Sequence, residues 1–560
     1  MDNHRSLLAI VLSVAVLLAW QYFFLPPPQS PPVKSAGEAV TPAEESSPLV
    51  APSPGLLGME SGIGMPAIGG EAAISTSQAR EITVETDLYT AVISEAGGVV
   101  KSFRLKGFRE EAPLDSPSKE LVKTGAAEGL PLLFSWGTEP GRAEPLLFSG
   151  SEQSLVLSGN KEKQLTLTAL SAAGLEITRT YTFRADDYRF DLAIEVRNTS
   201  DTPIQGAPYL ALVSRPFNGG AKKGAVDPFL FIGPKVLLDD AVVELKVKEL
   251  AKERSGRNFT GRIGWAGYED TYFMTTLIPL NQGQATAHFA ASGDERVYTV
   301  LAGAAEIIPP QGTARYAYAA YFGPKKVSLL KEQGQSLERA VNFGWFDVLA
   351  RPTLFLLNFF HGLVNNYGIA IILVTILIKL AFWPISHKGM KSMKMMQKIQ
   401  PKMAKVREKF KDDRERQQQE MLKLYQTYKV NPLGGCLPML LQIPVFFALY
   451  KVLLQSIELR HAPFMLWISD LSAPDRLPIG VDIPWLGGIP VLTLLMGGSM
   501  FLQQKMTPTT GDPMQAKIMM FLPVIFTFMF LNFASGLVLY WLVNNLLTIG
   551  QQYMINRQPS

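Results

Sequence analysis

The fold of this chain is decided by residues 386–429, which read SHKGMKSMKMMQKIQPKMAKVREKFKDDRERQQQEMLKLYQTYK. Thirteen of these residues are lysine or arginine and five are acidic. The stretch lies between two apolar segments, 367–384 and 432–455, each close to the ~20 residues that a helix needs to cross a bilayer. A strongly basic loop between two spans stays in the cytoplasm. These residues therefore predict a membrane protein and fix the orientation of the spans on either side.

The composition predicts one aqueous domain and one membrane domain. The 560 residues are 47% hydrophobic, which is high for a soluble chain and low for a bundle of membrane helices alone. The single cysteine, Cys436, excludes an intrachain disulfide. A domain exported from the cytoplasm must therefore be held together by the burial of its side chains.

Residues 1–25 predict a signal-anchor transmembrane helix with its N-terminus inside. Arg5 precedes an apolar run that ends in bulky aromatic residues, and no small-x-small cleavage site follows. A cleaved signal peptide is the alternative, because it too opens with a basic residue before an apolar run. Residues 26–77 are rich in Pro, Gly, Ser and Ala, which is typical of a flexible linker.

Residues 78–330 show the two-residue period of β-strands. Between Tyr188 and Val196 every second residue is apolar, and a polar turn follows at 198–201. Further alternating segments are separated by Gly and Asn turns. The pattern predicts a large antiparallel β-sandwich, and about 250 residues are enough to build a core without disulfides.

Residues 337–366 mix aromatic and charged residues directly before an apolar segment. Trp345, Phe355 and Phe359 are among the aromatic residues, and Arg351 is among the charged ones. Aromatic residues beside a span favour an amphipathic helix that lies in the outer membrane interface. A soluble helix that packs under the β domain is the alternative.

The remaining apolar segments predict an α-helical membrane bundle. Together with the N-terminal anchor they give six transmembrane helices, of which five form a core within residues 367–557. The positive-inside rule places both termini in the cytoplasm and the β domain in the periplasm of a cell with two membranes. The five predicted core spans are 367–384, 432–455, 485–503, 517–533 and 535–553.

The basic loop 386–429 also has the spacing of a helical hairpin. The first apolar series, at steps of three and four residues, is Met396, Ile399, Met403, Val406 and Phe410. A second apolar series follows the polar break at 411–413: Met421, Leu424, Tyr425 and Tyr428. Pro401 should kink the first helix, because proline lacks the N–H donor. Methionine offers a pliable apolar surface, and the basic face suits anionic lipid or ribosomal RNA. The residues that the seam does not explain form a candidate capture surface: Met390, Met393, Met395, Lys391 and Lys394.

Lys379 lies within the apolar segment 367–384. An ionisable group inside a membrane usually faces protein or a wet cavity, which makes Lys379 a candidate functional residue. The alternative is that its ammonium group reaches the inner headgroups, since Pro384 is only five residues away. Polar residues elsewhere in the spans are more often partners in hydrogen bonds between helices.

The second half of the chain holds five distinctive motifs: NPLGGCLP at 431–438, QIPVF at 442–446, ELRHAPF at 458–464, QKMTP at 504–508 and SGLVLY at 535–540. These motifs resemble those of the YidC-type membrane protein insertases of the YidC/Oxa/Alb family. The resemblance covers residues 340–557 densely, and the anchor, linker and β domain are similar to the Gram-negative form of the family.

This resemblance implies a function that spacing alone does not indicate. Insertases of this family integrate nascent inner-membrane proteins, alone or with the Sec translocon, through a groove that opens to the cytoplasm and the lipid. Their groove carries one basic residue, usually arginine, and Lys379 stands at that position here; the charge is kept but the bidentate guanidinium is lost. The same alignment makes five further residues candidates for groove or substrate contact: Thr375, Gln442, Tyr540, Trp541 and Asn545.

The implied partners are nascent membrane proteins, the Sec translocon, the membrane lipids, and the ribosome or the signal recognition machinery through the cytoplasmic loops. We expect no DNA partner, no catalytic residue, no cofactor and no metal. A carbohydrate-active enzyme is an alternative, because the β domain of the family resembles a mutarotase, but this segment holds one histidine, His288. A channel or solute transporter is the other alternative, and the lack of Asp and Glu in the core spans disfavours it.

Overall fold

The computed structural model describes residues 79–560, with some gaps. The signal anchor predicted at 1–25 and the linker predicted at 26–77 therefore lie outside the described residues. Cys436 and most of the 431–438 motif lie outside them as well. The gaps fall at 114, 139–145, 218–229, 254, 282, 429–436, 481–485, 507–512 and 558–560.

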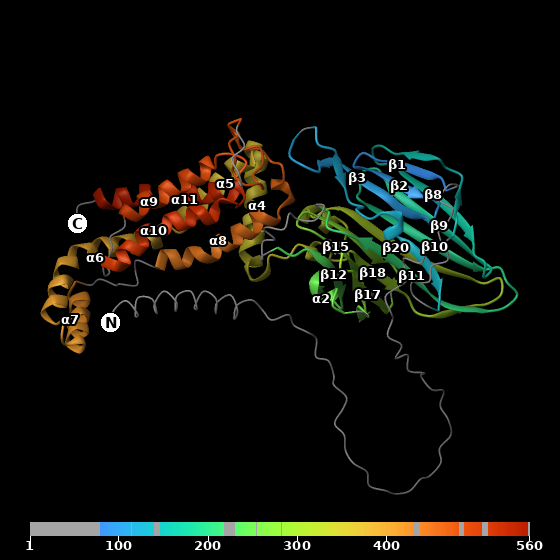
Figure 1. The fold of residues 1–560 in the computed structure, drawn as a ribbon, viewed down its shortest axis with the longest axis horizontal. Helices are drawn as coiled ribbons and strands as arrows, with labels where there is room; N and C mark the ends of the chain where they lie inside the picture. Colours follow the sequence, from blue (N-terminus) through green and yellow to red (C-terminus); the bar gives the residue numbers. More distant parts are fainter. Residues whose placement is uncertain are drawn as a thin grey trace, which may run out of the picture. The chain divides into compact units, whose positions relative to one another are not determined.

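The described residues up to Pro324 form three β-sheets, stacked in layers (Figure 1). Every neighbouring pair of named strands is antiparallel except β1 and β7, which run parallel. The five-stranded sheet has the spatial order β4 (Ser118–Glu120), β3 (Val99–Arg109), β2 (Tyr89–Ser94), β1 (Glu81–Glu85) and β7 (Ser154–Val156).

The two larger sheets hold the remaining strands. The nine-stranded sheet has the order β13 (Ala241–Glu244), β12 (Gly233–Leu238), β15 (Ile263–Glu269), β16 (Phe273–Pro279), β20 (Thr313–Pro324), β10 (Arg189–Asn198), β9 (Leu175–Arg184), β8 (Glu162–Leu170) and β6 (Ser149–Gly150). The six-stranded sheet has the order β14 (Arg257–Gly261), β17 (Ala285–Ala291), β18 (Val297–Ala302), β11 (Ile204–Ser214) and β19 (Glu306–Ile308), with β5 (Leu133–Gly137) also paired to β11.

The alternation seen in the sequence sets which side chains these strands bury. In β10 the apolar side chains alternate with polar ones, and Phe190, Leu192, Ile194 and Val196 are buried. Successive side chains of a strand point to opposite faces, so this period gives one face to the core.

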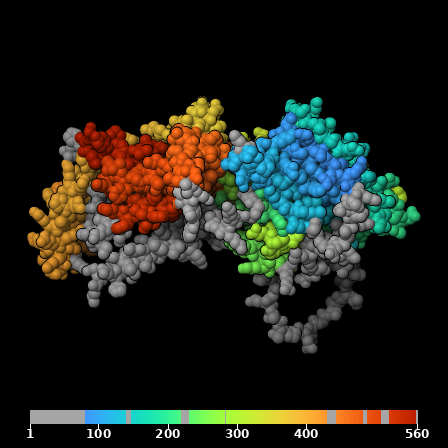
Figure 2. Space-filling model, turned by 45° about the horizontal axis from the view of Figure 1, so that its top comes forward, coloured from blue at the N-terminus to red at the C-terminus, as the bar shows by residue number. Residues whose placement is uncertain are grey.

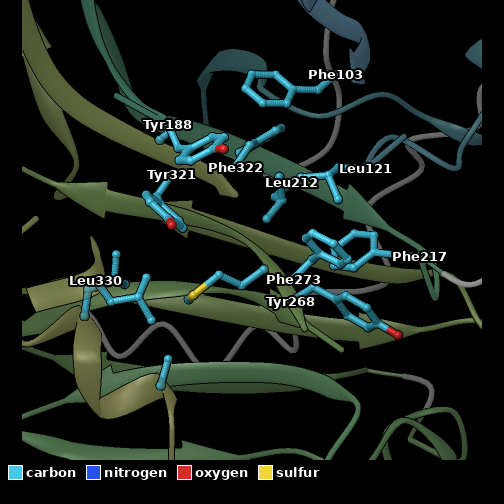
Figure 3. Packing of buried hydrophobic residues seen from close by; sticks show 14 of the residues in the cluster. Phe103, Leu121, Tyr188, Leu212, Phe217, Tyr268, Phe273, Tyr321, Phe322 and Leu330 are labelled. Carbon is cyan, nitrogen blue, oxygen red and sulfur yellow. The ribbon is translucent and has the colours of Figure 1, made fainter. Parts of the chain in front are cut away.

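Aromatic side chains from different sheets meet in this core (Figure 3). Phe103 of β3 packs edge-on against Phe322 of β20, with ring centroids 5.3 Å apart, and thereby joins the five-stranded sheet to the nine-stranded one. Phe217, which follows β11, meets Tyr268 of β15 in the same geometry at 5.6 Å. Such edge-to-face pairs add to the free energy gained by burial alone.

A buried ion cluster links the nine-stranded sheet to the segment that follows it. Glu269 Oε1 accepts hydrogen bonds from Lys235 Nζ at 2.7 Å and from Lys325 Nζ at 2.9 Å. Lys235 Nζ also donates to the carbonyl of Ala340 at 3.1 Å, in the short 3-10 helix η2 (Leu337–Ala340). The cluster therefore ties β12, β15 and the end of β20 to the segment that leads into the helices.

The helices follow in chain order after the sheets. Two short ones, α2 (Val247–Leu250) and α3 (Val327–Glu332), precede the main bundle. The predicted amphipathic region 337–366 divides into η2, η3 (Gly344–Phe346) and α4. The main helices are α4 (Asp347–Val364), α5 (Tyr367–Ala381), α6 (Trp383–Lys409), α7 (Arg414–Thr427), α8 (Leu437–Gln455), α9 (Val491–Met506), α10 (Pro513–Phe530) and α11 (Ser535–Arg557).

The five predicted core spans coincide in large part with α5, α8, α9, α10 and α11. Helices α9 and α11 end beyond their predicted spans, and α10 begins before its span. Taken one at a time, none of the described helices has both the length and the apolar composition required to cross a membrane. The pair formed by α5 and α6, which meet at a 65° bend, satisfies that requirement together.

The loop 386–429 forms the helical hairpin of α6 and α7, at the end of the helical region away from α4 (Figures 1 and 2). Three of the predicted seam residues, Met396, Ile399 and Met403, are buried against Met421, Leu424, Tyr425 and Tyr428. Val406 and Phe410, which the spacing also assigned to the seam, are only half-buried and lie outside this cluster. Helix α6 runs through Pro401 without ending there. The turn is closed by Asp413, whose Oδ1 accepts the N–H of Arg416 at 3.0 Å and so caps α7.

Replacing Glu269 with Gln should destabilise the β region by roughly 3–5 kcal/mol, because two buried ammonium groups lose their shared carboxylate. The matched control is Glu195→Gln, which removes the partner of the exposed Arg315 and should cost less than about 1 kcal/mol. Thermal unfolding of the purified full chain measures both. Equal unfolding temperatures for the two variants would show that the cluster does not hold this region together.

Candidate functional site

Lys379 lies in the last turn of α5 and meets α11. Its Nζ donates a hydrogen bond to Thr548 Oγ1 at 2.7 Å, and the side chain is half-buried. Thr548 Oγ1 in turn donates to the carbonyl of Asn544 at 2.6 Å. The partner of Lys379 is a neutral hydroxyl, so this contact does not neutralise the positive charge. A charge held in this way still attracts an anionic group that enters the site.

Thr548 belongs to a polar stripe on the second half of α11. Asn545 Nδ2 donates to Ser499 Oγ of α9 at 3.0 Å, and Gln551 Nε2 donates to Ser386 Oγ of α6 at 2.9 Å. Residues 545, 548 and 551–552 follow at steps of three or four and therefore share one face of the helix. This stripe, defined as Asn545, Thr548, Gln551 and Gln552, is buried against three other helices.

The first half of α11 carries aromatic side chains in place of the polar stripe. Tyr540 is buried and its hydroxyl hydrogen-bonds the side chain of Gln442 in α8. Trp541 packs edge-on against Phe446, with ring centroids 4.7 Å apart, and also contacts Phe530 of α10 at 5.3 Å. The interior of the bundle thus changes from aromatic to polar along α11.

Thr375 is placed differently from the other candidate groove residues. Its side chain is 1% exposed, and its Oγ1 donates to the carbonyl of Ile371 in the preceding turn at 2.6 Å. A hydroxyl satisfied within its own helix gives no free group to a substrate in this structure. The other five candidates all lie at contacts between helices: Lys379, Gln442, Tyr540, Trp541 and Asn545.

The candidate capture surface divides into two sets. Met390, Met393 and Lys394 line a small hollow with Met506 and the end of α11. Lys394 Nζ donates to the carbonyls of Ile555 at 3.0 Å and of Asn556 at 3.2 Å. These carbonyls belong to the last turn of α11, where a cation is favoured, so Lys394 ties the base of the hairpin to that helix.

The other capture candidates lie elsewhere on α6. Met395 packs against the seam of the hairpin, and the side chain of Lys391 is exposed. The spacing in the sequence assigned Met395 to the candidate capture surface, whereas its side chain packs against the seam.

The loop between α8 and α9 closes the opposite end of the bundle. Asp475 Oδ2 accepts the backbone N–H groups of Leu492 at 2.5 Å and Thr493 at 3.2 Å, which caps α9. Its Oδ1 accepts the indole N–H of Trp467 at 2.6 Å. Backbone N–H groups at the start of α11, those of residues 535 and 536, donate to carbonyls at 473 and 471. One loop thereby holds the starts of two core helices.

Several residues of this site were not predicted from the sequence. One is Thr548, which accepts from Lys379, and two others are Gln551 and Ser386, which bond to each other. In the sequence, Thr548 and Gln551 follow Asn545 at steps of one helical turn, so both could have been recognised as polar residues on its face. Lys451 was also overlooked, although it lies inside a predicted span; it is half-buried in α8. Ser386 carried no signal, since nothing in the local sequence indicates its contact with α11.

His288, the basis of the enzyme alternative, lies on β17 and is 3% exposed. Its Nδ1 is 2.6 Å from Asn258 Oδ1 on the neighbouring strand, and burial lowers the pKa of its imidazole. A histidine enclosed in this way does not present a proton-transfer group to a sugar. Among the described residues, no group of three or more His, Cys, Asp or Glu side chains is placed to hold a metal ion.

Comparisons with known proteins cover both halves of the chain. Residues 81–356 match the family model described as YidC periplasmic domain, and residues 359–560 match the model described as 60Kd inner membrane protein. The membrane protein insertase YidC of Geotalea daltonii is 41% identical over 558 residues, which are 99% of each chain. That of Syntrophus aciditrophicus is 42% identical over 569 residues, covering 99% of this chain and 100% of the relative.

One solved structure is similar over most of the length. A crystal structure described as an active YidC insertase with its first transmembrane domain resolved is 19% identical, with a TM-score of 0.36. The similarity covers 85% of this chain and 92% of that one.

Replacing Gly497 with Ala should loosen the contact between α9 and α10. A Cβ atom at this position would lie 2.1 Å from Thr527 Oγ1, so one helix must shift, which costs about 1–3 kcal/mol. Gly498→Ala is the matched control, because a Cβ there meets no atom within 4 Å. Thermal unfolding in detergent should therefore occur at a lower temperature for Gly497→Ala than for Gly498→Ala. The reverse order would show that the two helices do not depend on this close approach.

Proposed function

The chain belongs to the YidC family of membrane protein insertases, and from this premise we propose which of its residues receive and release a substrate. It is an inner-membrane, multi-pass insertase rather than an enzyme, with a β-rich periplasmic domain and a helical core. Its substrates are nascent membrane proteins.

We propose that six helices span the membrane, with both termini in the cytoplasm and the β-sandwich outside. The helix predicted at 1–25 is the first span, and the segments around α5, α8, α9, α10 and α11 are the other five. The basic excess of residues 386–429 supports this orientation, because the hairpin they form then lies in the cytoplasm. The match of residues 81–356 to a periplasmic domain supports an outer position for the start of α5.

Lys379 and the polar stripe of α11 form the proposed substrate groove in the inner half of the bundle. The observation that carries this proposal is the contact of Lys379 Nζ with Thr548 Oγ1, which holds a positive charge against a neutral partner. Further polar groups come from Asn545 and Tyr540 of α11 and from Gln442 of α8. Aromatic packing around Trp541 and the loop held by Asp475 close the outer end. Thr375 supports α5 from within and does not contact substrate.

This arrangement lowers the cost of moving a hydrophilic tail across the membrane. A polar groove in the inner half shortens the apolar distance that the tail must cross without hydrogen-bond partners. The charge of Lys379 attracts an acidic tail. The membrane potential favours the outward transfer of each negative charge by about 2.3 kcal/mol for each 100 mV. The apolar segment that follows then partitions into lipid, and no covalent bond has to form or break.

The base of the hairpin is the proposed entry surface for a nascent chain. Met390 and Met393 give a pliable apolar lining beside α11, and the exposed Lys391 adds positive charge. Lys394 and Met395 contribute by holding the hairpin in place. The Sec translocon, the ribosome or the signal recognition machinery would approach from this side, and anionic lipid would bind the basic face.

Substitutions at Lys379 test the groove. Lys379→Arg should retain insertion, whereas Lys379→Ala should slow insertion about 10-fold for substrates with acidic tails, if the lost attraction is worth about 1.4 kcal/mol. Lys379→Glu should be slower still, because like charges repel. The measurement is the insertion rate into proteoliposomes for substrates that differ only in tail charge. Neutral tails are the control, and equal rates for acidic tails in all variants would remove Lys379 from the mechanism.

Single cysteines in a Cys436→Ser background test the orientation. Asp201→Cys lies in an exposed turn after β10, and Lys411→Cys lies at the exposed tip of the hairpin. A membrane-impermeant maleimide added to cells with a permeable outer membrane should label position 201 and leave position 411 unlabelled until the inner membrane is opened. Labelling of both positions from outside would contradict six spans in this orientation.

A further inference from the structure

The loop between α8 and α9 presents an apolar tip. Residues 462–469 read APFMLWIS and contain no charged side chain. Leu466 is 85% exposed and Met465 is 48% exposed. The charged residues of the loop lie on either side of this run and bind within the protein; Asp470 Oδ1, for example, accepts the N–H of His461 at 3.0 Å.

The conformation of the tip is well defined. The N–H of Phe464 donates to the carbonyl of Ile468 at 2.9 Å, and the N–H of Ile468 donates to the carbonyl of Met465 at 3.1 Å. Leu466 lies between them with φ 56°, in the left-handed region that glycine and asparagine adopt most readily. Leucine is unfavourable here for two reasons: its backbone is in a strained conformation, and its large apolar side chain is exposed to solvent. Such a combination points to a function of the side chain outside the fold.

The tip is fixed to the corner where α4 meets α5. Asn366 precedes α5; its Oδ1 accepts the N–H of Ile369 and caps the helix, while its Nδ2 donates to the carbonyl of Phe464 at 2.8 Å. The ring of Phe464 packs on Gly368, where a Cβ atom would lie 2.0 Å from it. If the loop after α8 left this corner, it would lose its hydrogen bond to the capping residue of α5 and the close packing of Phe464 on Gly368.

In the orientation proposed above, on which this inference rests, the corner lies at the outer membrane surface, and it is bordered by an apolar stripe. The periplasmic domain ends at residue 356 and α5 begins at Tyr367, so the corner faces the outer leaflet. Phe355, Phe359 and Leu363 recur every four residues along α4 and are 52–68% exposed. Trp467, directly after the tip, is half-buried with its indole N–H bound to Asp475, an amphipathic residue of the kind found at membrane interfaces.

We propose that Met465 and Leu466 insert into the acyl-chain region of the outer leaflet and, together with the stripe of α4, hold the outer end of α5 at a fixed depth. The occupant of this surface is phospholipid, because the tip is uncharged, continuous with the lipid-facing surface of a membrane protein, and attached to the start of a spanning segment. Burial in the acyl chains provides the apolar environment that an exposed leucine lacks in water.

A fluorescent depth measurement on the full chain tests this proposal. Leu466→Cys in a Cys436→Ser background is labelled with an environment-sensitive nitrobenzoxadiazole probe and reconstituted into vesicles of zwitterionic and anionic phospholipid. Ser469→Cys is the matched control, because Ser469 is exposed in the same loop but polar. We expect emission at shorter wavelength from position 466 than from 469, and stronger quenching of 466 by lipids with a nitroxide near the headgroup than at the chain end.

The other outcomes overturn the proposal. Equal emission from positions 466 and 469, at the wavelength of the probe in water, would place the tip in the periplasm. Shorter-wavelength emission from position 466 without quenching by either nitroxide lipid would mean that the tip is covered by protein, either this chain or a second copy.

Discussion

Lipid offers no hydrogen-bond partner, so each polar side chain between the membrane helices depends on a partner within the protein. In the described part of the core, α11 supplies that partner to three other helices. Thr548 accepts from Lys379 of α5, Asn545 donates to α9, and Gln551 donates to α6. A slide of α11 by one residue would break all three contacts, which is why this stripe fixes the register of the bundle. The positive charge of Lys379 is held in place by the same constraint.

The β region obeys a different constraint, because it has no cysteine and must rely on burial. Aromatic pairs such as Phe103 and Phe322 join sheets whose strands are far apart in sequence. The ion cluster at Glu269 adds charged groups to the same interior, where they remain only because each finds an opposite charge. Through Ala340 this cluster also fixes the chain that leads into α4, so the stability of the sheets and the placement of α4 are linked.

The spacing of apolar residues predicted the elements whose buried face depends on the local sequence alone. The alternation at 188–196 predicted β10, and the steps of three and four residues predicted the seam around Met396 and Ile399, because each period sets which side chains share a face. The motifs that resemble the family located Lys379, whose groove role stays a prediction. The partner of Lys379 could not be predicted, since Thr548 is 169 residues away and the contact exists only after the helices pack.

The hydrogen-bond partners of individual side chains could not be predicted from the sequence either. Thr375 lies one turn from Lys379, yet it bonds back to its own helix, and a hydroxyl can do this at any position of a helix. Lys394 resembles the other lysines of the hairpin in every local respect, and only the end of α11 beside it distinguishes it. Residues of one type and one spacing thus differ in role because of neighbours that are distant in the chain.

The shape of α6 has a mechanical consequence. With 27 residues the helix is about 40 Å long. Its hydrogen bonds to α11 from Ser386 and Lys394 lie in its first half. Pro401 follows in the second half, where the missing N–H makes the helix easiest to bend. A small change of angle at Pro401 would therefore displace the tip of the hairpin, while the base of α6 keeps its hydrogen bonds to α11.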